Sequence, residues 1–356
     1  MKLSFESNLH YQQEAVSSIT GLFEGQPIGN GLLQTELSEL DTYAHIYSYG
    51  NRLVISENQI LENLQSIQKK NEINVSSQLE GMHFSVEMET GTGKTYVYLR
   101  TIYELNKLYG FKKFVIVVPS IAIREGVLKN LEITHDHFQT LYDNVPLNFQ
   151  VYDSTKVSSL RGFATTNNIE VLVINIDSFA KDENIINKPN DKLTGQKPVE
   201  FIQATHPIVI VDEPQNMETE KRIAAIKNLN ALCTIRYSAT HKNLYNLTYS
   251  LNPVKAYDLG LVKQIEVDSI MEENAFNDAF VSVDSITATK TKKKTKITIN
   301  SNEKGRVTKK TFNVKVEDDL YKLSNEREIY SEGYIIEEID AVNQTISFSN
   351  GTILYK

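Results

Sequence analysis

The chain has 356 residues, a formal charge of −8 and 40% hydrophobic residues, a composition typical of a globular protein with two or three domains. The acidic balance excludes a protein that coats nucleic acid through bulk positive charge, although it allows a local basic groove. A single cysteine, Cys233, excludes a disulfide framework and a cysteine-rich zinc site, and it favours a cytoplasmic location. No stretch has the length and apolar character of a membrane span or a signal peptide, so we expect no membrane partner.

The first 80 residues are expected to form a helical segment with an insertion. Apolar residues recur at helical spacing from Leu9 to Phe23, and glycines and a proline at 25–31 end that helix. A second helical pattern covers residues 60–67. We therefore assign residues 1–80 to an N-terminal helical segment whose insertion has no legible function.

Residues 82–265 alternate short, β-branched apolar runs with helical stretches. Strands that are apolar on both faces and alternate with helices predict a parallel sheet covered by helices on both sides, so we assign an α/β domain to 81–265. Residues 181–205 are rich in Asn, Asp, Lys and Gly and predict a long exposed loop. The predicted strands are 83–87, 114–118, 170–174, 208–211 and 233–237.

The last segment, 266–356, changes character. Alternating apolar and polar residues at 296–299, 312–316 and 345–348 predict half-buried antiparallel strands, and Asn350-Gly351 predicts a tight hairpin. Lysines gather at 290–296, where either DNA contact or a solvated hairpin would account for them. We assign a small β-rich module to this segment.

A phosphate-binding loop is the most specific feature of the chain. Residues 88–95 read Met-Glu-Thr-Gly-Thr-Gly-Lys-Thr, between a predicted strand and a predicted helix. Gly91 and Gly93 let several backbone N–H groups point at one anion, and the helix N-terminus adds partial positive charge. Lys94 would reach the β- and γ-phosphates, and the Thr95 hydroxyl would ligate Mg²⁺. Met88 stands where Gly is usual, and the alternative is a Gly-rich turn before an ordinary helix.

A pair of carboxylates, Asp212 and Glu213, follows the predicted strand at 208–211. Asp212 would hold Mg²⁺, and Glu213 would orient and deprotonate an attacking water, as an NTP hydrolase requires. The alternative is a solvated acidic pair at a strand end. Together with the phosphate-binding loop, the pair predicts a Mg²⁺-dependent nucleotide hydrolase.

Several segments resemble the first motor domain of superfamily-two helicases, and specifically the restriction (Res) subunit of type III restriction–modification enzymes. The resemblance covers about residues 1–265. The matching segments are Tyr11-Gln12 with Glu14-Ala15, Thr90 to Thr95 preceded by Met88-Glu89, Val118 to Gly126, Asp212 to Gln215, Ser238-Ala239-Thr240, and Arg236 to Ile265.

The resemblance implies a P-loop RecA-like domain that binds ATP and Mg²⁺ and contacts double-stranded DNA. In that family pattern Gln12 would read adenine, although Gln13 is an alternative, and the ATP phosphates would lie against Thr90, Gly91, Thr92, Gly93, Lys94 and Thr95. Ser238 and Thr240 would couple the carboxylates to the sheet, although short hydroxyl residues after a strand are also common turn formers. Ser120 and Arg124 would hold a DNA phosphate, with pairing between Arg124 and Glu125 as the alternative. Asn175 and Ser178 are weaker candidates for the same groove.

The resemblance also implies partners outside these residues. We find no second apolar α/β unit after residue 265 and no Asp…Glu-x-Lys nuclease pattern, so we expect a fragment or split subunit. The expected function is the ATP-hydrolysing motor part of a Res subunit, working with the remaining Res domains and a modification methyltransferase subunit, and coupling hydrolysis to DNA translocation or switching before cleavage. The alternative is a nucleotide-dependent module that docks DNA or the methyltransferase without motor activity.

Overall fold

The computed structural model describes residues 5–29, 46–262, 279–288, 293–303 and 305–356. The chain divides into two compact units, Met1–Gln264 and Ile265–Lys356. The first unit thus includes both the N-terminal helical segment and the α/β region in a single body. Among the described helices, none combines the length and apolar character needed to cross a membrane.

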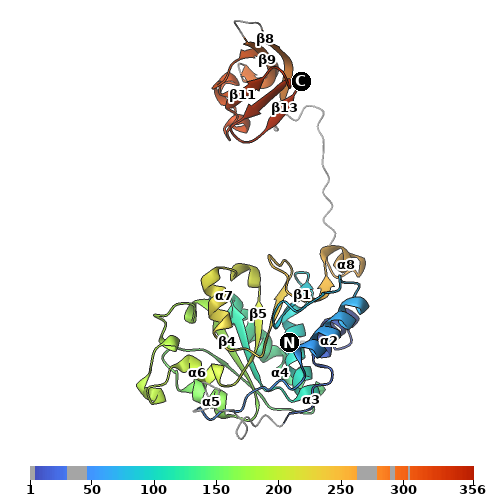
Figure 1. Ribbon diagram of the computed structural model, residues 1–356, viewed down its shortest axis with the longest axis vertical. Helices are drawn as coiled ribbons and strands as arrows, with labels where there is room; N and C mark the ends of the chain where they lie inside the picture. The colour runs from blue at the N-terminus through green and yellow to red at the C-terminus, as the bar shows by residue number, and fades with distance from the viewer. Residues whose placement is uncertain (1–4, 30–45, 263–278, 289–292, 304) are drawn as a thin grey trace. The chain divides into compact units, whose positions relative to one another are not determined.

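The first unit is built on a seven-stranded sheet in which every neighbouring pair is parallel, in the order β3-β4-β2-β5-β6-β1-β7 (Figure 1). This parallel α/β sheet confirms the fold class expected from the sequence. The strands are β1 (His83–Met88), β2 (Lys113–Val118), β3 (Leu147–Val151), β4 (Ile169–Asn175), β5 (Ile208–Asp212), β6 (Cys233–Ser238) and β7 (Leu247–Leu251).

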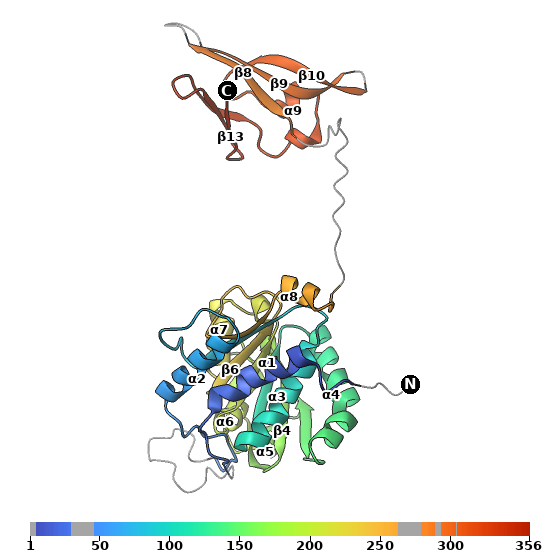
Figure 2. The same cartoon turned by 90° about the vertical axis from the view of Figure 1, so that its right-hand side faces the viewer.

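Helices cover both faces of this sheet, as the continuously apolar strands predict. In β2, Phe114 and Ile116 point into one apolar core and Val115 and Val117 into the other. The first core packs against helices that lie side by side in Figure 2: α1 (His10–Thr20), α2 (Glu57–Lys70), α3 (Lys94–Tyr109) and α4 (Ile121–Leu141). The second core packs against α5 (Ser159–Thr165), α6 (Pro198–Gln203) and α7 (Glu220–Lys227).

Local signals in the sequence set where the helices begin and end. Ser56 caps α2 and Ser120 caps α4, because each side chain accepts a hydrogen bond from a backbone N–H in the first helical turn. Gly110 ends α3 in the left-handed conformation that glycine adopts without steric penalty. A short helix, α8 (Pro253–Asp258), follows β7 with proline in its first turn.

The prediction of an exposed loop at 181–205 was wrong. The segment forms two single-turn helices, η3 (Ile185–Asn187) and η4 (Asp191–Leu193), followed by the whole of α6. Its apolar residues are spaced too irregularly to show a helical period, yet six of them are buried in the second core: Ile186, Leu193, Val199, Phe201, Ile202 and Ala204.

The second unit contains two three-stranded antiparallel sheets around a separate apolar core. One sheet holds β8 (Val281–Ala288), β9 (Lys293–Glu303) and β10 (Arg306–Val314), and the other holds β11 (Ile336–Asp340), β12 (Thr345–Phe348) and β13 (Ile353–Tyr355), with α9 (Leu320–Leu323) between the two in sequence. Gly351, with φ of 82°, turns the predicted hairpin between β12 and β13. Lys290 and Lys292 lie outside the described residues.

Candidate nucleotide site and the adjoining groove

The loop between β1 and α3 has the shape of an anion-binding turn. Gly91 and Gly93 adopt φ of 81° and 91°, a conformation that other residues take only under strain. Gly93 forms the N-cap of α3, so the first turn of that helix, which begins at Lys94, points its free N–H groups at the loop. The backbone of β1 reaches the loop through Met88, which is fully buried.

Helix α1 holds this loop from outside. The Tyr11 hydroxyl and the Gln12 Nε2 group each donate a hydrogen bond of 3.1 Å to the carbonyl oxygen of Thr92. Gln12 also passes so close to Gly93 that a Cβ there would lie 2.6 Å from Gln12 Nε2. Position 93 therefore requires glycine for two reasons: its φ is positive, and the Gln12 side chain leaves no room for a Cβ atom.

Thr92 differs from its neighbours in the loop. Its side chain is buried, and its hydroxyl donates a 2.7 Å hydrogen bond to the carbonyl of Glu89. The Thr92 N–H points to the same carbonyl at 3.3 Å. In this structure Thr92 shapes the loop, whereas Thr90, Gly91, Gly93, Lys94 and Thr95 line the cavity beside it.

Lys94 and Glu213 meet across the cavity. Lys94 Nζ lies 3.1 Å from Glu213 Oε1, and both side chains are largely enclosed. Glu213 follows β5 in a left-handed conformation, with φ of 53°, and its N–H donates to the Tyr237 carbonyl. A strained backbone at a non-glycine residue is held only by strong surrounding contacts, and it is frequent in active sites. The fold therefore forces this carboxylate toward the phosphate-binding loop.

Asp212 is the more deeply buried of the two carboxylates. Tyr98 of α3 donates a 3.4 Å hydrogen bond to Asp212 Oδ2. Burial, followed by the neighbouring charge of Glu213, raises the pKa of Asp212 to about 6. A divalent cation beside Asp212 would compensate the buried negative charge, which is the chemistry expected of a Mg²⁺ ligand.

A hydrogen-bond relay links Glu213 to the end of β6. Ser238 Oγ donates to Gln215 Oε1 at 2.7 Å, and Gln215 Nε2 donates to Glu213 Oε2 at 2.6 Å. Ser238 also accepts a hydrogen bond from the N–H of Thr240. Ser238 thus reaches Glu213 mainly through Gln215, while Thr240 contributes its backbone. Sequence reasoning quoted Gln215 only as part of a motif and gave it no role.

The cavity at this loop has room for a nucleotide. Its volume is about 520 Å³, within the range of about 300–1,000 Å³ usual for small-molecule sites. Gln12 and Glu213 line it together with five residues of the loop and first helical turn, and the rest of the wall consists of Phe5, Glu6, Leu9, Tyr96 and Asn130. The donor set fits a Mg²⁺–nucleotide complex, since it combines backbone N–H groups, a lysine, a threonine hydroxyl and carboxylates.

A separate open groove follows the carboxyl ends of β2, β3 and β4. Ser120, Arg124, Asn175 and Ser178 all line it, so the structure brings together the four residues considered for DNA. Ser120 Oγ accepts from the Ile123 N–H as a helix cap. Arg124 pairs with the exposed side chain of Glu125 at 2.8 Å, the alternative that the sequence left open.

One buried ion pair near the nucleotide site was missed at the sequence level. Arg236 of β6 donates to Glu218 Oε1 at 2.7 Å, and Asn243 donates to Glu218 Oε2 at 2.9 Å. This pair ties the segment after Glu213 to the segment after Thr240. The available signal was a single arginine inside an otherwise apolar strand, because a buried charge requires a partner.

A family model described as "Type III restriction enzyme, res subunit" matches residues 8–243. The chain belongs to this family. It is 30% identical over 287 residues to the EcoP15I Res subunit of Escherichia coli, covering 74% of this chain and 28% of that protein. It is 32% identical over 246 residues to the StyLTI Res subunit of Salmonella typhimurium, covering 58% of this chain and 25% of that protein. The chain therefore spans about a quarter of the length of these relatives.

Two solved structures align with parts of the chain. The SWI2/SNF2 ATPase core of Sulfolobus solfataricus, in complex with double-stranded DNA, aligns with a TM-score of 0.32 and 14% identity, covering 52% of this chain and 31% of that one. A nuclease-deletion mutant of the Type ISP restriction–modification enzyme LlaGI aligns with a TM-score of 0.36 and 15% identity, covering 59% and 21%.

Proposed function

We propose that this chain is the ATP-binding and ATP-hydrolysing motor part of a type III restriction enzyme Res subunit. The observation that carries the proposal is the meeting of Lys94 and Glu213 at 3.1 Å, because it joins the phosphate-binding loop and one strand-end carboxylate, Glu213, in one cavity. Asp212 is the buried last residue of β5, directly before Glu213. Hydrolysis would be coupled to DNA translocation, or to switching before DNA cleavage.

Each residue of the cavity has a chemical task in this proposal. Lys94 contacts the β- and γ-phosphates, which neutralises negative charge where it develops during phosphoryl transfer. Thr95 and Asp212 would hold Mg²⁺, which would supply positive charge next to the phosphates when bound. Glu213 orients the attacking water and accepts its proton, since it lies at the cavity while its other oxygen is fixed by Gln215.

Gln12 is proposed to read the nucleotide base. Its Nε2 group donates to the loop at Thr92, which fixes the amide and leaves Oε1 as an acceptor for the exocyclic amino group of adenine. A guanine base presents a carbonyl oxygen at the corresponding position, so this geometry favours ATP.

The proposed partners follow the family. Double-stranded DNA would lie in the groove that Ser120 and Arg124 line, while the remaining Res domains and a modification methyltransferase subunit would complete a cytoplasmic enzyme. A second RecA-like domain would supply the arginine that accelerates phosphoryl transfer by about 10³–10⁵-fold in related enzymes. We therefore expect slow hydrolysis by this chain without those domains.

The test is ATP hydrolysis with and without duplex DNA, measured for the chain within the complete enzyme and by itself. We expect DNA to stimulate turnover, and we expect Lys94→Ala and Glu213→Gln to abolish the stimulated rate. Unchanged turnover in both variants would contradict the proposal. Nucleotide and DNA binding with no hydrolysis in the complete enzyme would instead identify a docking module.

A further inference from the structure

Arg222 of α7 joins the nucleotide site to the groove. Its Nη1 group donates to the carbonyl oxygen of Asn216 at 2.8 Å, and its Nη2 group donates to Asp177 Oδ1 at 2.8 Å. One guanidinium group thus holds two segments that lie 39 positions apart in the sequence.

The first of these segments belongs to the nucleotide site. Asn216 ends the single-turn helix η5 (Pro214–Asn216), which begins directly after Glu213. Gln215, inside that turn, donates the 2.6 Å hydrogen bond that fixes Glu213. A displacement of Glu213 is therefore transmitted to the Asn216 carbonyl through three residues of continuous, hydrogen-bonded backbone.

The second segment belongs to the groove. Asp177 lies in η2 (Ile176–Ser178), directly after β4, and it lines the groove together with Ser120, Arg124 and Ser178. Its backbone N–H donates to Asn175 Oδ1 at 2.9 Å, so the position of Asp177 also sets the end of β4.

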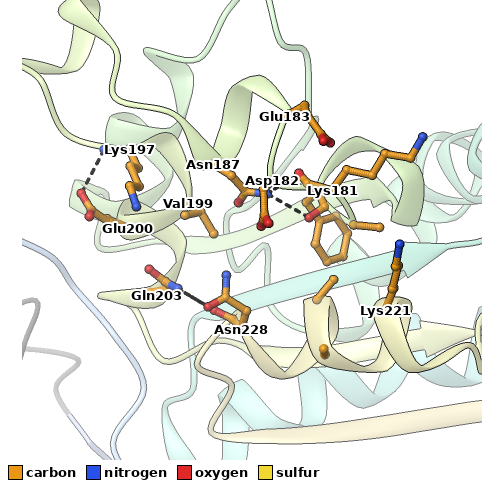
Figure 3. Close-up of a pocket in the computed structure, with 14 residues that line it drawn as sticks. Lys181, Asp182, Glu183, Asn187, Lys197, Val199, Glu200, Gln203, Lys221 and Asn228 are labelled. Carbon is orange, nitrogen blue, oxygen red and sulfur yellow. Dashed lines mark hydrogen bonds between the residues drawn. The ribbon is translucent and has the colours of Figure 1, made fainter.

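Helix α7 buries little of its own surface, and a pocket runs along its length from Lys221 to Asn228. Figure 3 shows this pocket, with Lys221 and Asn228 of the α7 region among its lining residues together with Val199 and other residues of the 181–203 segment. Phe179, Ala224 and Ala225 also line it and make part of its wall apolar. Ile226 is the one residue of α7 that is buried. Beyond its C-terminal end, Gln203 Nε2 donates to the Asn228 carbonyl at 2.6 Å. The helix is therefore fixed at one end by packing and at the other end by Arg222.

We propose that Arg222 is the positioning residue that couples occupancy of the nucleotide site to the shape of the groove. This inference rests on the proposed function, because it assumes that ATP binds at Lys94 and DNA in the groove. The planar guanidinium fixes two acceptors at once, whereas a lysine offers one point charge on a flexible stem. We call the Arg222 guanidinium group and its two hydrogen bonds, to the Asn216 carbonyl and to Asp177, the fork. A shift of the η5 turn is transmitted to Asp177 through this fork and through a rotation of α7 about its packed C-terminal end.

The fork contributes to coupling more than to folding. The Arg222 and Asp177 side chains are 30% and 62% exposed, and an ion pair this exposed adds little to the stability of a domain. We therefore expect Arg222→Ala to fold with an unchanged melting transition and to bind each ligand separately.

The experiment measures the affinity of the full chain for a non-hydrolysable ATP analogue with Mg²⁺, with and without saturating duplex DNA. In the unaltered chain we expect DNA to change that affinity by a coupling factor of about 5–150. Arg222→Ala and Asp177→Ala should bring the factor to about 1–2, and the double variant should cause no further loss because both remove the same link. Arg222→Lys, which keeps the charge, should recover only a small part of the coupling.

Lys221→Ala is the matched control. Lys221 is the neighbouring exposed cation on α7, and its loss removes the same charge without touching the fork. We expect it to keep the full coupling factor. Full coupling in Arg222→Ala would overturn this inference and leave the proposed function standing. Absence of coupling in the unaltered chain would overturn both the DNA dependence of the proposed function and this inference.

Discussion

The phosphate-binding loop and the groove lie at the same carboxyl edge of one sheet. The loop is formed mainly by backbone groups, whereas the groove is formed mainly by side chains. The loop uses the backbone: two glycines at positive φ, the first turn of α3, and Lys94, whose side chain is only 11% exposed. The groove uses side chains at the surface, where Arg124 pairs with its neighbour Glu125, whose side chain is 59% exposed.

This difference separates a preorganised site from an adjustable one. Donors fixed by backbone geometry need no rearrangement when a phosphate arrives, which is what transition-state stabilisation requires. Exposed side chains that pair with each other can exchange partners at little cost, which suits a track for a moving DNA backbone. Substitutions in the loop should therefore have large effects on ATP hydrolysis, whereas substitutions of Ser120 and Arg124 in the groove should have small effects on stability and DNA affinity.

The largest effect is expected from Lys94→Ala. Removing the buried ammonium group leaves Glu213 without its partner and the phosphates without their main cation, so the rate constant for hydrolysis should fall by about 10²–10³-fold or more. Steady-state ATP hydrolysis by the complete enzyme is the measurement. Lys107→Ala, at the exposed end of the same helix, is the control and should hydrolyse ATP normally. Equal losses in the two variants would show that α3, and not the site, had been damaged.

A second prediction separates the two glycines. Alanine at position 91 or 93 would have to adopt a left-handed backbone conformation, which costs about 1–2 kcal/mol. A Cβ at 93 also collides with Gln12 Nε2 at 2.6 Å, whereas a Cβ at 91 has nothing within 4 Å. Gly93→Ala should therefore lower the melting temperature and nucleotide affinity more than Gly91→Ala does.

Thermal denaturation and binding of a fluorescent ATP analogue would measure both variants. Adding Gln12→Ala to Gly93→Ala should restore part of the lost stability, because it removes the collision. Equal melting temperatures and equal nucleotide affinities for the two glycine variants would contradict the close contact between Gln12 of α1 and Gly93.

The third prediction concerns pH. Because burial raises the pKa of Asp212 to about 6, its proton competes with Mg²⁺ below that pH, and affinity for Mg²⁺–ATP should fall by up to about tenfold per pH unit. The folded state binds this proton more tightly than the unfolded chain, so the buried charge destabilises the fold above pH 6, and this cost is relieved as pH falls toward 4.

Asp212→Asn tests both consequences. It should raise the free energy of unfolding at pH 8 by about 1–3 kcal/mol, and it should weaken Mg²⁺–ATP binding above about pH 6, where Asp212 is charged. Urea denaturation and calorimetric binding are the measurements. A pH-dependent affinity for Mg²⁺–ATP that persists unchanged in Asp212→Asn would assign the titration to another group.

The smallest effects are expected in the groove. Arg124→Ala should weaken duplex DNA binding only several-fold and reduce the slope of log affinity against log salt by about one, as the loss of one phosphate contact does. Ser120→Ala should cost about 1 kcal/mol of stability through its cap on α4. Fluorescence anisotropy across a salt series checks the first and thermal melting the second. If Arg124→Ala lowered DNA affinity by a factor as large as the factor by which Lys94→Ala lowers the hydrolysis rate, the groove would be preorganised like the loop.

The sequence predicted those parts of the molecule that backbone chemistry determines. The glycines at 91 and 93, the strand that delivers Asp212, and the Asn350-Gly351 hairpin each leave a local pattern. The strands β3 and β7 were not predicted, since their burial depends on tertiary neighbours. The relay through Gln215 and the fork at Arg222 were also missed, because each joins segments that only the folded sheet brings together.

The most direct test of the central claim separates binding of ATP from its hydrolysis at Glu213. The measurement is a single-turnover assay with Glu213→Gln in the complete enzyme, in which bound ATP and released phosphate are quantified in the same sample. The glutamine keeps the size of the side chain but cannot accept a proton, and its one oxygen can accept a hydrogen bond from either Gln215 or Lys94. We predict stoichiometric ATP binding with phosphate release slowed by at least about 100-fold. Phosphate release at the unaltered rate would contradict the assignment of Glu213 as the base, and with it this account of the site.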